Sequence, residues 1–488
     1  MKVKLDIKKM ILIIIISIIM ACNVYFDNRL LISSFEQGVY AVLKMEGSSS
    51  SSLIPAIIYI AVCFVIICPI LLLPVIDFGK KLVISIKNKI IQLYPIRNIK
   101  IYSMFLIFAS IIFFLYVIEF FPFVKNVILS DTEIFEDYYV DGSKVEFTFP
   151  KEKRNLIYIF LESMESTNVS VENGGLFEET VIPNLERLAI ENINFSNNDK
   201  IGGASHIDSC SWTAAAMIAH TSGVPLRVSL NDFDVNSTRF NNVTSIGDIL
   251  SDNGYNNYLL LGSDASFGGR RAYFANHDYL IKDYYTAIDD GIIGEDYYEW
   301  WGYEDSKLFT YAKDILSDIS QDDKPFNFTM LTANTHFKDG YLEDTCDSKF
   351  DDPYSNSFYC SDNMINEFIE WLKEQDFYDN TTIVIVGDHL TMQKDYYDNN
   401  KGYERSIYNV FINANVVGDY NNKNRGFTVM DMFPTTIASL GVDIEGDRIG
   451  LGTNLFSDKE TIPEIVGMDM FKEELSKGSN YYYNYIRK

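Results

Sequence analysis

Three long apolar runs near the N-terminus constrain the fold of this chain more than any other feature. They occupy residues 10–26, 53–76 and 102–124. Each approaches or exceeds the roughly 20 residues that a helix needs to cross a bilayer. The first run follows a basic start, but no small-residue cleavage site comes after it, so we expect a retained anchor and not a signal peptide. The sequence therefore predicts a membrane anchor of three transmembrane helices within residues 1–125.

The basic residues around these runs predict how the anchor is oriented. Four Lys precede the first run and residues 77–101 hold six Lys or Arg, whereas residues 27–52 hold only two. Short loops rich in Lys and Arg stay on the cytoplasmic side of a membrane. We therefore expect a multi-pass membrane protein, with the chain after the third run outside the cytoplasm.

The charge of the chain is divided unevenly. Residues 1–125 carry 13 Lys or Arg against 6 Asp or Glu, a net +7, so the total of −26 leaves −33 on residues 126–488. An acidic soluble part behind a basic, apolar part argues against nucleic-acid binding. The partner that this division indicates is a lipid bilayer.

Cysteine usage agrees with an extracytoplasmic location. Cys346 and Cys360 lie 14 positions apart in a polar segment. An oxidising compartment permits a disulfide between them, worth on the order of 3 kcal/mol in the chain-entropy model. Three other cysteines fall in the apolar runs, and Cys210 is expected to be a small buried residue.

The soluble part alternates apolar strands with amphipathic helices. Residues 126–153 are polar and are expected to form a linker. Strands are then predicted at 155–162, 256–262, 325–333 and 381–390, and helices at 183–195 (running into a strand), 212–220, 244–254, 304–320, 361–375 and 428–441. This alternation predicts an α/β domain with a largely parallel sheet. The strands are apolar throughout, as expected when helices cover both faces of the sheet.

Acids and imidazoles follow three of these strands. The strand ends are Leu-Glu162-Ser, Asn-Thr-His336 and Gly-Asp388-His389. A single acid at a strand end often only marks a turn. In a parallel sheet, however, these four side chains meet at the carboxyl edge, where open α/β folds bind ligands. They predict a catalytic or metal site, and their donor atoms suit Mn²⁺, Mg²⁺ or Zn²⁺.

A candidate nucleophile precedes a predicted helix. Thr213 stands at the start of the helix in SCSWTAAAMIAHTSGVPL (209–226). Such a Thr can simply cap the helix. A helix N-terminus also attracts anions, and a hydroxyl beside a metal ion there would be activated toward a phosphate group.

These segments together resemble a known family. The residues that carry the resemblance are NLIYIFLES, SCSWTAAAMIAHTSGVPL, LTANTHFKDGY, the Cys346–Cys360 loop, VGDHL and DMFPTTIASLGVDIEGDRIGLGTNLF. They are similar to the phosphoglycerol transferase I and lipoteichoic acid synthase group of the alkaline phosphatase–sulfatase superfamily, over residues 154 to about 457. The resemblance implies an alkaline phosphatase-like catalytic domain over 154–470, with 471–488 as a C-terminal tail, in a protein of a bacterial cell membrane.

The resemblance also implies roles for individual residues. The family's metal ligands fall on Glu162, Thr213, Asp388 and His389, with Thr213 as the nucleophile. Its phosphate-contacting histidine falls on His336. A headgroup-contacting arginine falls on Arg270, with Arg271 as a rival. Lipoteichoic acid synthases place a Trp two residues before that Arg, where this chain has Gly268, so the headgroup contact and the donor preference stay open.

The activity implied is transfer of glycerol phosphate from phosphatidylglycerol to a glycan or polyglycerol-phosphate acceptor, with one divalent metal, Mn²⁺ ahead of Mg²⁺ or Zn²⁺. A phosphoethanolamine transferase with the same Thr nucleophile is the main alternative. A non-catalytic membrane module is another alternative. A sulfatase would need Cys or Ser where GVPLR has Gly223, which cannot become formylglycine.

Overall fold

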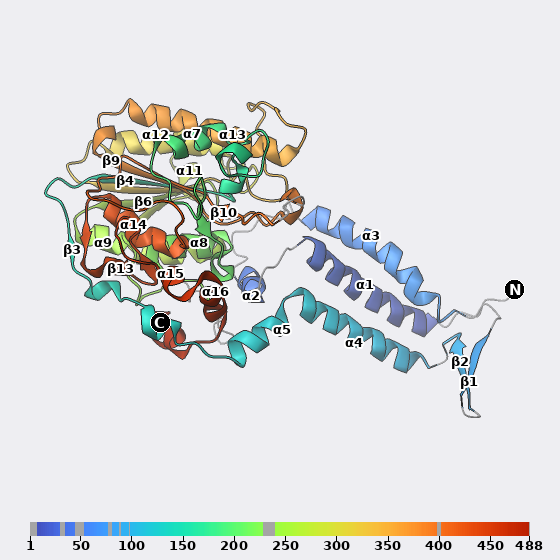
Figure 1. Ribbon diagram of the computed structural model, residues 1–488. Helices are drawn as coiled ribbons and strands as arrows, with labels where there is room; N and C mark the ends of the chain where they lie inside the picture. The colour runs from blue at the N-terminus through green and yellow to red at the C-terminus, as the bar shows by residue number, and fades with distance from the viewer. Residues whose placement is uncertain are drawn as a thin grey trace. The chain divides into compact units, whose positions relative to one another are not determined.

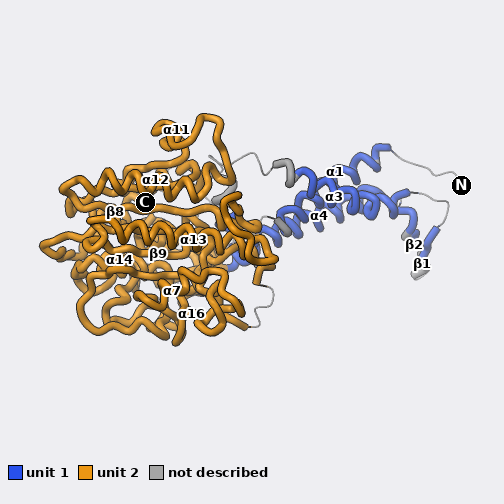
Figure 2. Tube along the Cα trace, turned by 90° about the horizontal axis from the view of Figure 1, so that it is seen from above, with its two compact units in different colours: residues 1–38, 49–125 blue, residues 39–48, 126–488 orange. Residues whose placement is uncertain are grey.

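The computed structural model describes residues 7–29, 35–43, 53–76, 81–86, 89–96, 98–227, 240–397 and 402–487. The chain divides into two compact units (Figure 2), one made of residues 1–38 and 49–125 and the other of residues 39–48 and 126–488.

Helices form most of the first unit. Its elements are α1 (Ile7–Arg29), α3 (Leu53–Leu72), α4 (Ile99–Val117), α5 (Phe120–Phe123) and a hairpin of β1 (Leu82–Ile86) and β2 (Lys89–Tyr94), while α2 (Phe35–Leu43) runs from this unit into the other. Helix α1 packs against both α3 and α4. Large apolar side chains stay exposed along these helices, as at Ile15 (50%) and Phe105 (65%). Such exposure is typical of helices whose surface faces lipid.

Two of the three expected spans pass a test of length and composition among the described residues. They are Met10–Asp27 in α1 and Ile99–Val117 in α4. The middle run does form α3, but the helix ends at Leu72 instead of continuing to 76, and its apolar stretch Ile57–Leu72 is shorter than the other two. Its role as a third span stays a prediction.

A six-stranded sheet forms the centre of the second unit. In spatial order its strands are β11 (Asn409–Ile412), β9 (Thr381–Gly387), β4 (Asn155–Leu161), β8 (Phe326–Leu331), β6 (Asn256–Leu261) and β7 (Tyr279–Lys282). Every neighbouring pair is parallel except β11 with β9. The predicted largely parallel sheet is therefore confirmed, with one antiparallel edge strand.

Helices cover both faces of this sheet (Figure 1). Residues of β4 alternate between two hydrophobic clusters: Tyr158 and Phe160 belong to one, and Ile157 and Ile159 to the other. The elements that surround the sheet are α7 (Pro183–Glu191), α8 (Thr213–Ser222), α9 (Ile246–Asp252), α10 (Arg270–Asn276), α11 (Tyr284–Asp289), α12 (Asp305–Ile319), α13 (Pro353–Lys373) and α14 (Met432–Ser439). Burial on both faces explains why the strands are apolar along their whole length.

Residues 126–153 are packed structure and not the linker expected from their polarity. They contain α6 (Ile134–Tyr138) and β3 (Phe147–Thr148), and β3 pairs with β12 (Asp443–Ile444). Phe135 is fully buried, and its ring centroid lies 5.1 Å from that of Tyr482. The expected C-terminal tail is likewise anchored, because Phe471 and Tyr482 are both buried. Apolar residues scattered among acids are enough to bury both segments in the domain.

Short elements complete the unit. They are α15 (Ile462–Val466), α16 (Met468–Ser476), the pair β5 (Ala204–Ser205) with β10 (Ser406–Ile407), and the pair β13 (Arg448–Ile449) with β14 (Gly452–Thr453).

Helix α13 begins eight residues before the predicted position of 361. Asp352 caps it by accepting from the Ser355 amide, and Pro353 occupies its first turn. Pro is favoured at that position because it lacks only an amide that would be unpaired there.

Candidate active site

Strand order brings the predicted acids and imidazoles to one edge. Strands β4 and β9 are direct neighbours, and Leu161 pairs with Gly387. Glu162 and Asp388 therefore follow at the same level of the sheet. His389 comes next, and the ligand atoms of these three residues all lie within 4.8 Å of one another. All three side chains are buried.

The chain leaves β geometry at the end of β9, which lets Asp388 and His389 point to one place. Successive side chains on a strand face opposite ways, so both residues converge only because the strand ends at Gly387. A side chain at Gly387 would collide with the carbonyl oxygen of Met164. Glycine is therefore required here for close backbone approach, and its φ is not in the left-handed region.

Ser163 supports both carboxylates, and the sequence did not identify it as a site residue. Its amide donates to Oδ1 of Asp388 at 2.8 Å, and its hydroxyl donates to Oε1 of Glu162 at 2.8 Å. Its φ is +55°, which is uncommon for a residue with a side chain. Strained residues of this kind persist where the surrounding structure holds them, often at functional sites. The only sequence signal was its place directly after Glu162.

Thr213 begins α8 with its hydroxyl turned toward the acids. Its Oγ1 donates to Oε2 of Glu162 at 3.1 Å and lies 3.4 Å from Nε2 of His389. The N-cap residue is Trp212, and it makes no side-chain cap bond. The hydroxyl of Thr213 thus belongs to the acidic cluster and not to a helix cap.

The donor atoms of the cluster suit a cation. The ring of His389 donates from Nδ1 to the carbonyl of Leu390 at 2.8 Å, so in the neutral ring Nε2 carries the lone pair. That atom lies 3.3 Å from Oδ2 of Asp388 and 3.6 Å from Oε1 of Glu162. Oδ2 of Asp388 is buried without a hydrogen-bond partner among the described residues. Converging acceptors with no proton between them repel one another unless a positive charge lies among them, so these residues fit a divalent ion.

The pKa values of the cluster reflect the same repulsion among its buried acceptor groups. Burial raises the pKa of Asp388 to about 7, and the neighbouring Glu162 carboxylate adds to the rise. Burial also opposes ionisation of Glu162, but the imidazoles of His336 and His389 outweigh it and lower the pKa of Glu162. Burial disfavours the charged form of His389, yet the carboxylates of Asp388 and Glu162 raise its pKa. Without a cation the cluster must retain protons to reduce its charge.

His336 lies in the turn after β8, at the rim of the cluster. Its Nδ1 donates to the carbonyl of Phe337 at 2.6 Å, and burial lowers the pKa of the ring. Nε2 of the neutral ring therefore presents a lone pair. The half-buried ring of Trp301 has its centroid 4.7 Å from that of His336 and 5.4 Å from that of Phe267. The sequence did not predict the contact of Trp301 with His336. It indicated only that the Trp found in lipoteichoic acid synthases is replaced here by Gly268, and Trp301 comes from a different loop.

The two candidate arginines lie in different surroundings. Arg270 is buried and donates to the carbonyls of Phe267 and Asp264 and to the hydroxyl of Ser263. Its charge also lowers the pKa of His336. Arg271 pairs with the buried carboxylate of Asp283, and its side chain is 42% exposed. The two arginines thus differ in burial, and Arg271 forms an ion pair with a carboxylate.

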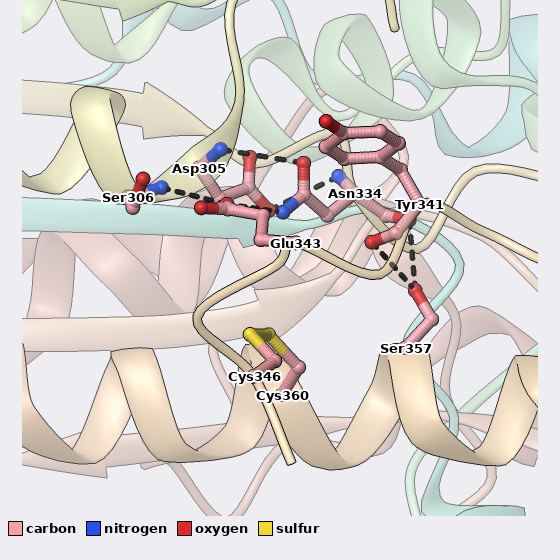
Figure 3. The surroundings of a disulfide bond; sticks show 8 residues. All are labelled: Asp305, Ser306, Asn334, Tyr341, Glu343, Cys346, Ser357 and Cys360. Atoms are coloured by element: carbon pink, nitrogen blue, oxygen red, sulfur yellow. Dashed lines mark hydrogen bonds between the residues drawn. A yellow bond between two sulfur atoms is a disulfide. The ribbon is translucent and has the colours of Figure 1, made fainter. Parts of the chain in front are cut away.

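A disulfide joins Cys346 to Cys360, with Cα atoms 5.6 Å apart (Figure 3). It ties the segment after His336 to α13. Cys22, Cys63, Cys68 and Cys210 are free thiols, and Cys210 is buried as expected.

Comparison with known proteins places the chain in a family. The family model described as Sulfatase matches residues 154–440, which contain every residue of the cluster. The chain belongs to the sulfatase family. Among curated relatives, phosphoglycerol transferase I of Xanthomonas axonopodis pv. citri is 30% identical over 260 residues, or 50% of this chain and 35% of the relative. Phosphoglycerol transferase I of Citrobacter koseri is 31% identical over 273 residues, covering 53% of this chain and 33% of the relative.

The chain thus spans about a third of the length of these relatives. Among solved structures, the lipoteichoic acid synthase LtaP from Listeria monocytogenes superposes with a TM-score of 0.51 at 20% identity, covering 65% of this chain and 80% of that one. This sulfatase-family domain therefore has the alkaline phosphatase-like fold.

Proposed function

We propose that this sulfatase-family protein is a membrane-anchored phosphotransferase that moves glycerol phosphate from phosphatidylglycerol to a hydroxyl acceptor outside the cytoplasm. The observation that carries the proposal is the contact of the Thr213 hydroxyl with Glu162 and His389, at the first residue of α8. A nucleophilic hydroxyl, an adjacent cation site and a helix N-terminus together suit attack on a phosphate diester.

The proposed donor and acceptor agree with other features of the chain. Similarity to phosphoglycerol transferase I supports glycerol phosphate as the transferred group. Two apolar helices long enough to cross a membrane support a lipid donor such as phosphatidylglycerol, because they would tether the domain to a bilayer. The distribution of Lys and Arg supports an extracytoplasmic domain, where glycans and polyglycerol phosphate offer acceptor hydroxyls.

The first displacement uses Thr213 as the nucleophile. Its hydroxyl proton passes toward Oε2 of Glu162, which already accepts its hydrogen bond. Oγ1 then forms a bond to phosphorus, the bond to the diacylglycerol oxygen breaks, and that oxygen takes up a proton from solvent while Glu162 keeps the proton of Thr213. Glycerophospho-Thr213 remains. Arg270 provides positive charge for the phosphate oxygens that gain charge in the transition state.

The second displacement returns the enzyme to its starting state. Nε2 of His336 has its lone pair free to accept the proton of the incoming acceptor hydroxyl. The acceptor oxygen bonds to phosphorus as the bond to Oγ1 of Thr213 breaks, Thr213 regains its proton from Glu162, and His336 releases the acceptor proton to solvent. Division into two displacements allows two bulky substrates to use one site in turn.

A divalent ion would be held by Glu162, Asp388, His389 and Thr213. Bound there, it supplies a lower pKa for the Thr213 hydroxyl and charge neutralisation for the phosphate. Carboxylate and hydroxyl oxygens favour Mn²⁺ or Mg²⁺, whereas the imidazole also suits Zn²⁺. We propose Mn²⁺ as the native ion.

Sulfatase chemistry does not fit this member of the family. The position at which a formylglycine precursor would be needed is Gly223, which ends α8 with φ +67°. At about 1.5 Å per residue, ten residues of helix separate it from Thr213 by roughly 15 Å. Gly223 is therefore remote from the proposed nucleophile Thr213 and has no side chain to convert, which supports transfer through Thr213 over sulfatase chemistry.

Headgroup-labelled lipids test the proposal directly. The full-length protein in mixed micelles is given phosphatidylglycerol or phosphatidylethanolamine, and both released diacylglycerol and the mass of the Thr213 peptide are measured. We expect diacylglycerol release and a glycerophosphate adduct with phosphatidylglycerol. An adduct formed only with phosphatidylethanolamine would replace the donor, and an unmodified Thr213 despite turnover would reject the nucleophile.

A further inference from the structure

The turn that carries His336 is fixed by a neighbouring helix. In α13, the hydroxyl of Tyr354 donates to the carbonyl of Thr335 at 2.7 Å, and the hydroxyl of Ser357 donates to the carbonyl of Asn334 at 2.9 Å. Cys360 follows three residues later and forms the disulfide with Cys346. Residues three apart are neighbours on a helix surface. One side of α13 therefore contacts the turn directly and also through the disulfide.

Glu343 connects the disulfide to the turn (Figure 3). Its carbonyl accepts from the amide of Cys346 at 3.0 Å. Its side chain is buried, and Oε1 accepts from Nδ2 of Asn334 at 2.7 Å and from the amide of Ser306 at 3.0 Å. An acceptor shared by a buried and a partly buried donor is costly to remove, because both donors lose their partner.

Asp305 also holds this turn. Its carboxylate accepts from the amides of Ala333 at 2.8 Å and Asn334 at 3.0 Å. The amide of His336 in turn donates to the carbonyl of Ala333 at 3.1 Å. Asn334 and His336 therefore belong to one hydrogen-bonded turn, and a shift of Asn334 moves the imidazole.

We propose that Glu343, tethered by the Cys346–Cys360 disulfide, is a positioning residue for His336. Through Asn334 it fixes the turn from which the imidazole reaches the reacting phosphate. This inference rests on the proposed function for its kinetic consequence but not for its structural one. Misplacement of a catalytic group by about 1 Å can cost on the order of 100-fold in rate.

The kinetic test uses a double-mutant cycle in the full-length protein. Glu343→Ala removes the shared acceptor, whereas Glu343→Gln keeps an oxygen that can accept both bonds. Asp344→Ala is the matched control, because Asp344 is the next residue and is exposed. We expect Glu343→Ala to lower kcat for diacylglycerol release at least tenfold with unchanged metal content, Glu343→Gln to stay within threefold, and Asp344→Ala to match the wild type.

Coupling to His336 separates positioning from general damage. In a His336→Ala background, Glu343→Ala should lower kcat no further, because the group that it positions is gone. If the fold losses in kcat from His336→Ala and Glu343→Ala multiply in the double variant, the proposal is overturned. Wild-type kcat in Glu343→Ala overturns it as well. If Glu343→Ala does not fold, the double replacement Cys346→Ser with Cys360→Ser keeps the carboxylate without its tether and is expected to lower kcat in the same His336-dependent way.

A second readout does not depend on turnover. The chain has five His, so ¹³C-labelled histidine gives few NMR signals, and His336→Ala assigns the one of interest. Glu343→Ala should change the chemical shift and titration of the His336 ring, while Asp344→Ala leaves them unchanged. An unchanged His336 signal overturns the positioning role. Wild-type turnover by His336→Ala, with a His336 signal that still responds to Glu343→Ala, instead rejects the catalytic role of His336 in the proposed function.

Discussion

Replacement of Thr213 by Ala separates nucleophilic function from fold support. The variant loses one hydrogen bond to a buried carboxylate, worth about 1.5–3 kcal/mol. Ala is a better helix residue than Thr by about 0.5 kcal/mol, and no cap is lost because Thr213 does not cap α8. The net cost is about 1–2.5 kcal/mol, which for a domain of this size lowers Tm by only a few degrees.

The kinetic effect should be far larger than this stability cost. Removal of a covalent nucleophile lowers kcat by about 1,000-fold or more. Diacylglycerol release from phosphatidylglycerol by the full-length protein measures the rate, and thermal unfolding measures the fold. Thr213→Ser is the matched control, since it keeps the hydroxyl and should retain both measurable turnover and the covalent adduct. Near-wild-type diacylglycerol release by Thr213→Ala would refute the reasoning.

Three further predictions concern the metal, pH and topology. Asp388→Ala should abolish binding of the divalent ion because it deletes a charged ligand, whereas His336→Ala should bind metal normally but transfer slowly; equal metal content in the two purified variants would contradict this division of roles. The raised pKa of Asp388, about 7, means that the metal-free fold holds a proton that the unfolded chain releases above about pH 4. In EDTA, thermal stability should therefore fall as pH rises toward 7, and Mn²⁺ should reverse the loss. Asp388→Asn should flatten the dependence of thermal stability on pH. The same dependence in Asp388→Asn and the wild type would exclude this residue as the cause. Protease added to intact spheroplasts should digest residues 154–488, and protection until lysis would reverse the proposed orientation.

Much of the architecture could be predicted from sequence because it depends on local pattern. The apolar and β-branched runs within 155–162 and 381–390 indicated buried strands, and both strands belong to the central sheet. A parallel sheet brings the carboxyl ends of its strands to one edge, so the acids and imidazoles after those runs were already candidates for one site. The polarity of residues 126–153 led to the wrong prediction of a linker. Burial of Phe135 in this segment depends on Tyr482, a partner more than 300 residues away in the chain.

Only the tertiary structure decided how the side chains meet. The order β9–β4–β8 places next to one another strands that are distant in sequence, and no local pattern encodes that order. Ser163, at φ +55°, and the alignment of Asp388 with His389 follow from the packing of two strand ends.

The same is true of the residues around the cluster. Arg270 and Arg271 are chemically identical neighbours in sequence, and only burial and the Asp283 partner distinguish them. Glu343 is one acid among many in its segment. The disulfide and the bond from Asn334 distinguish it as the proposed positioning residue. Sequence specifies which groups are available and where each element ends. Distances between groups on different elements depend on packing, and the chemistry of this site depends on those distances.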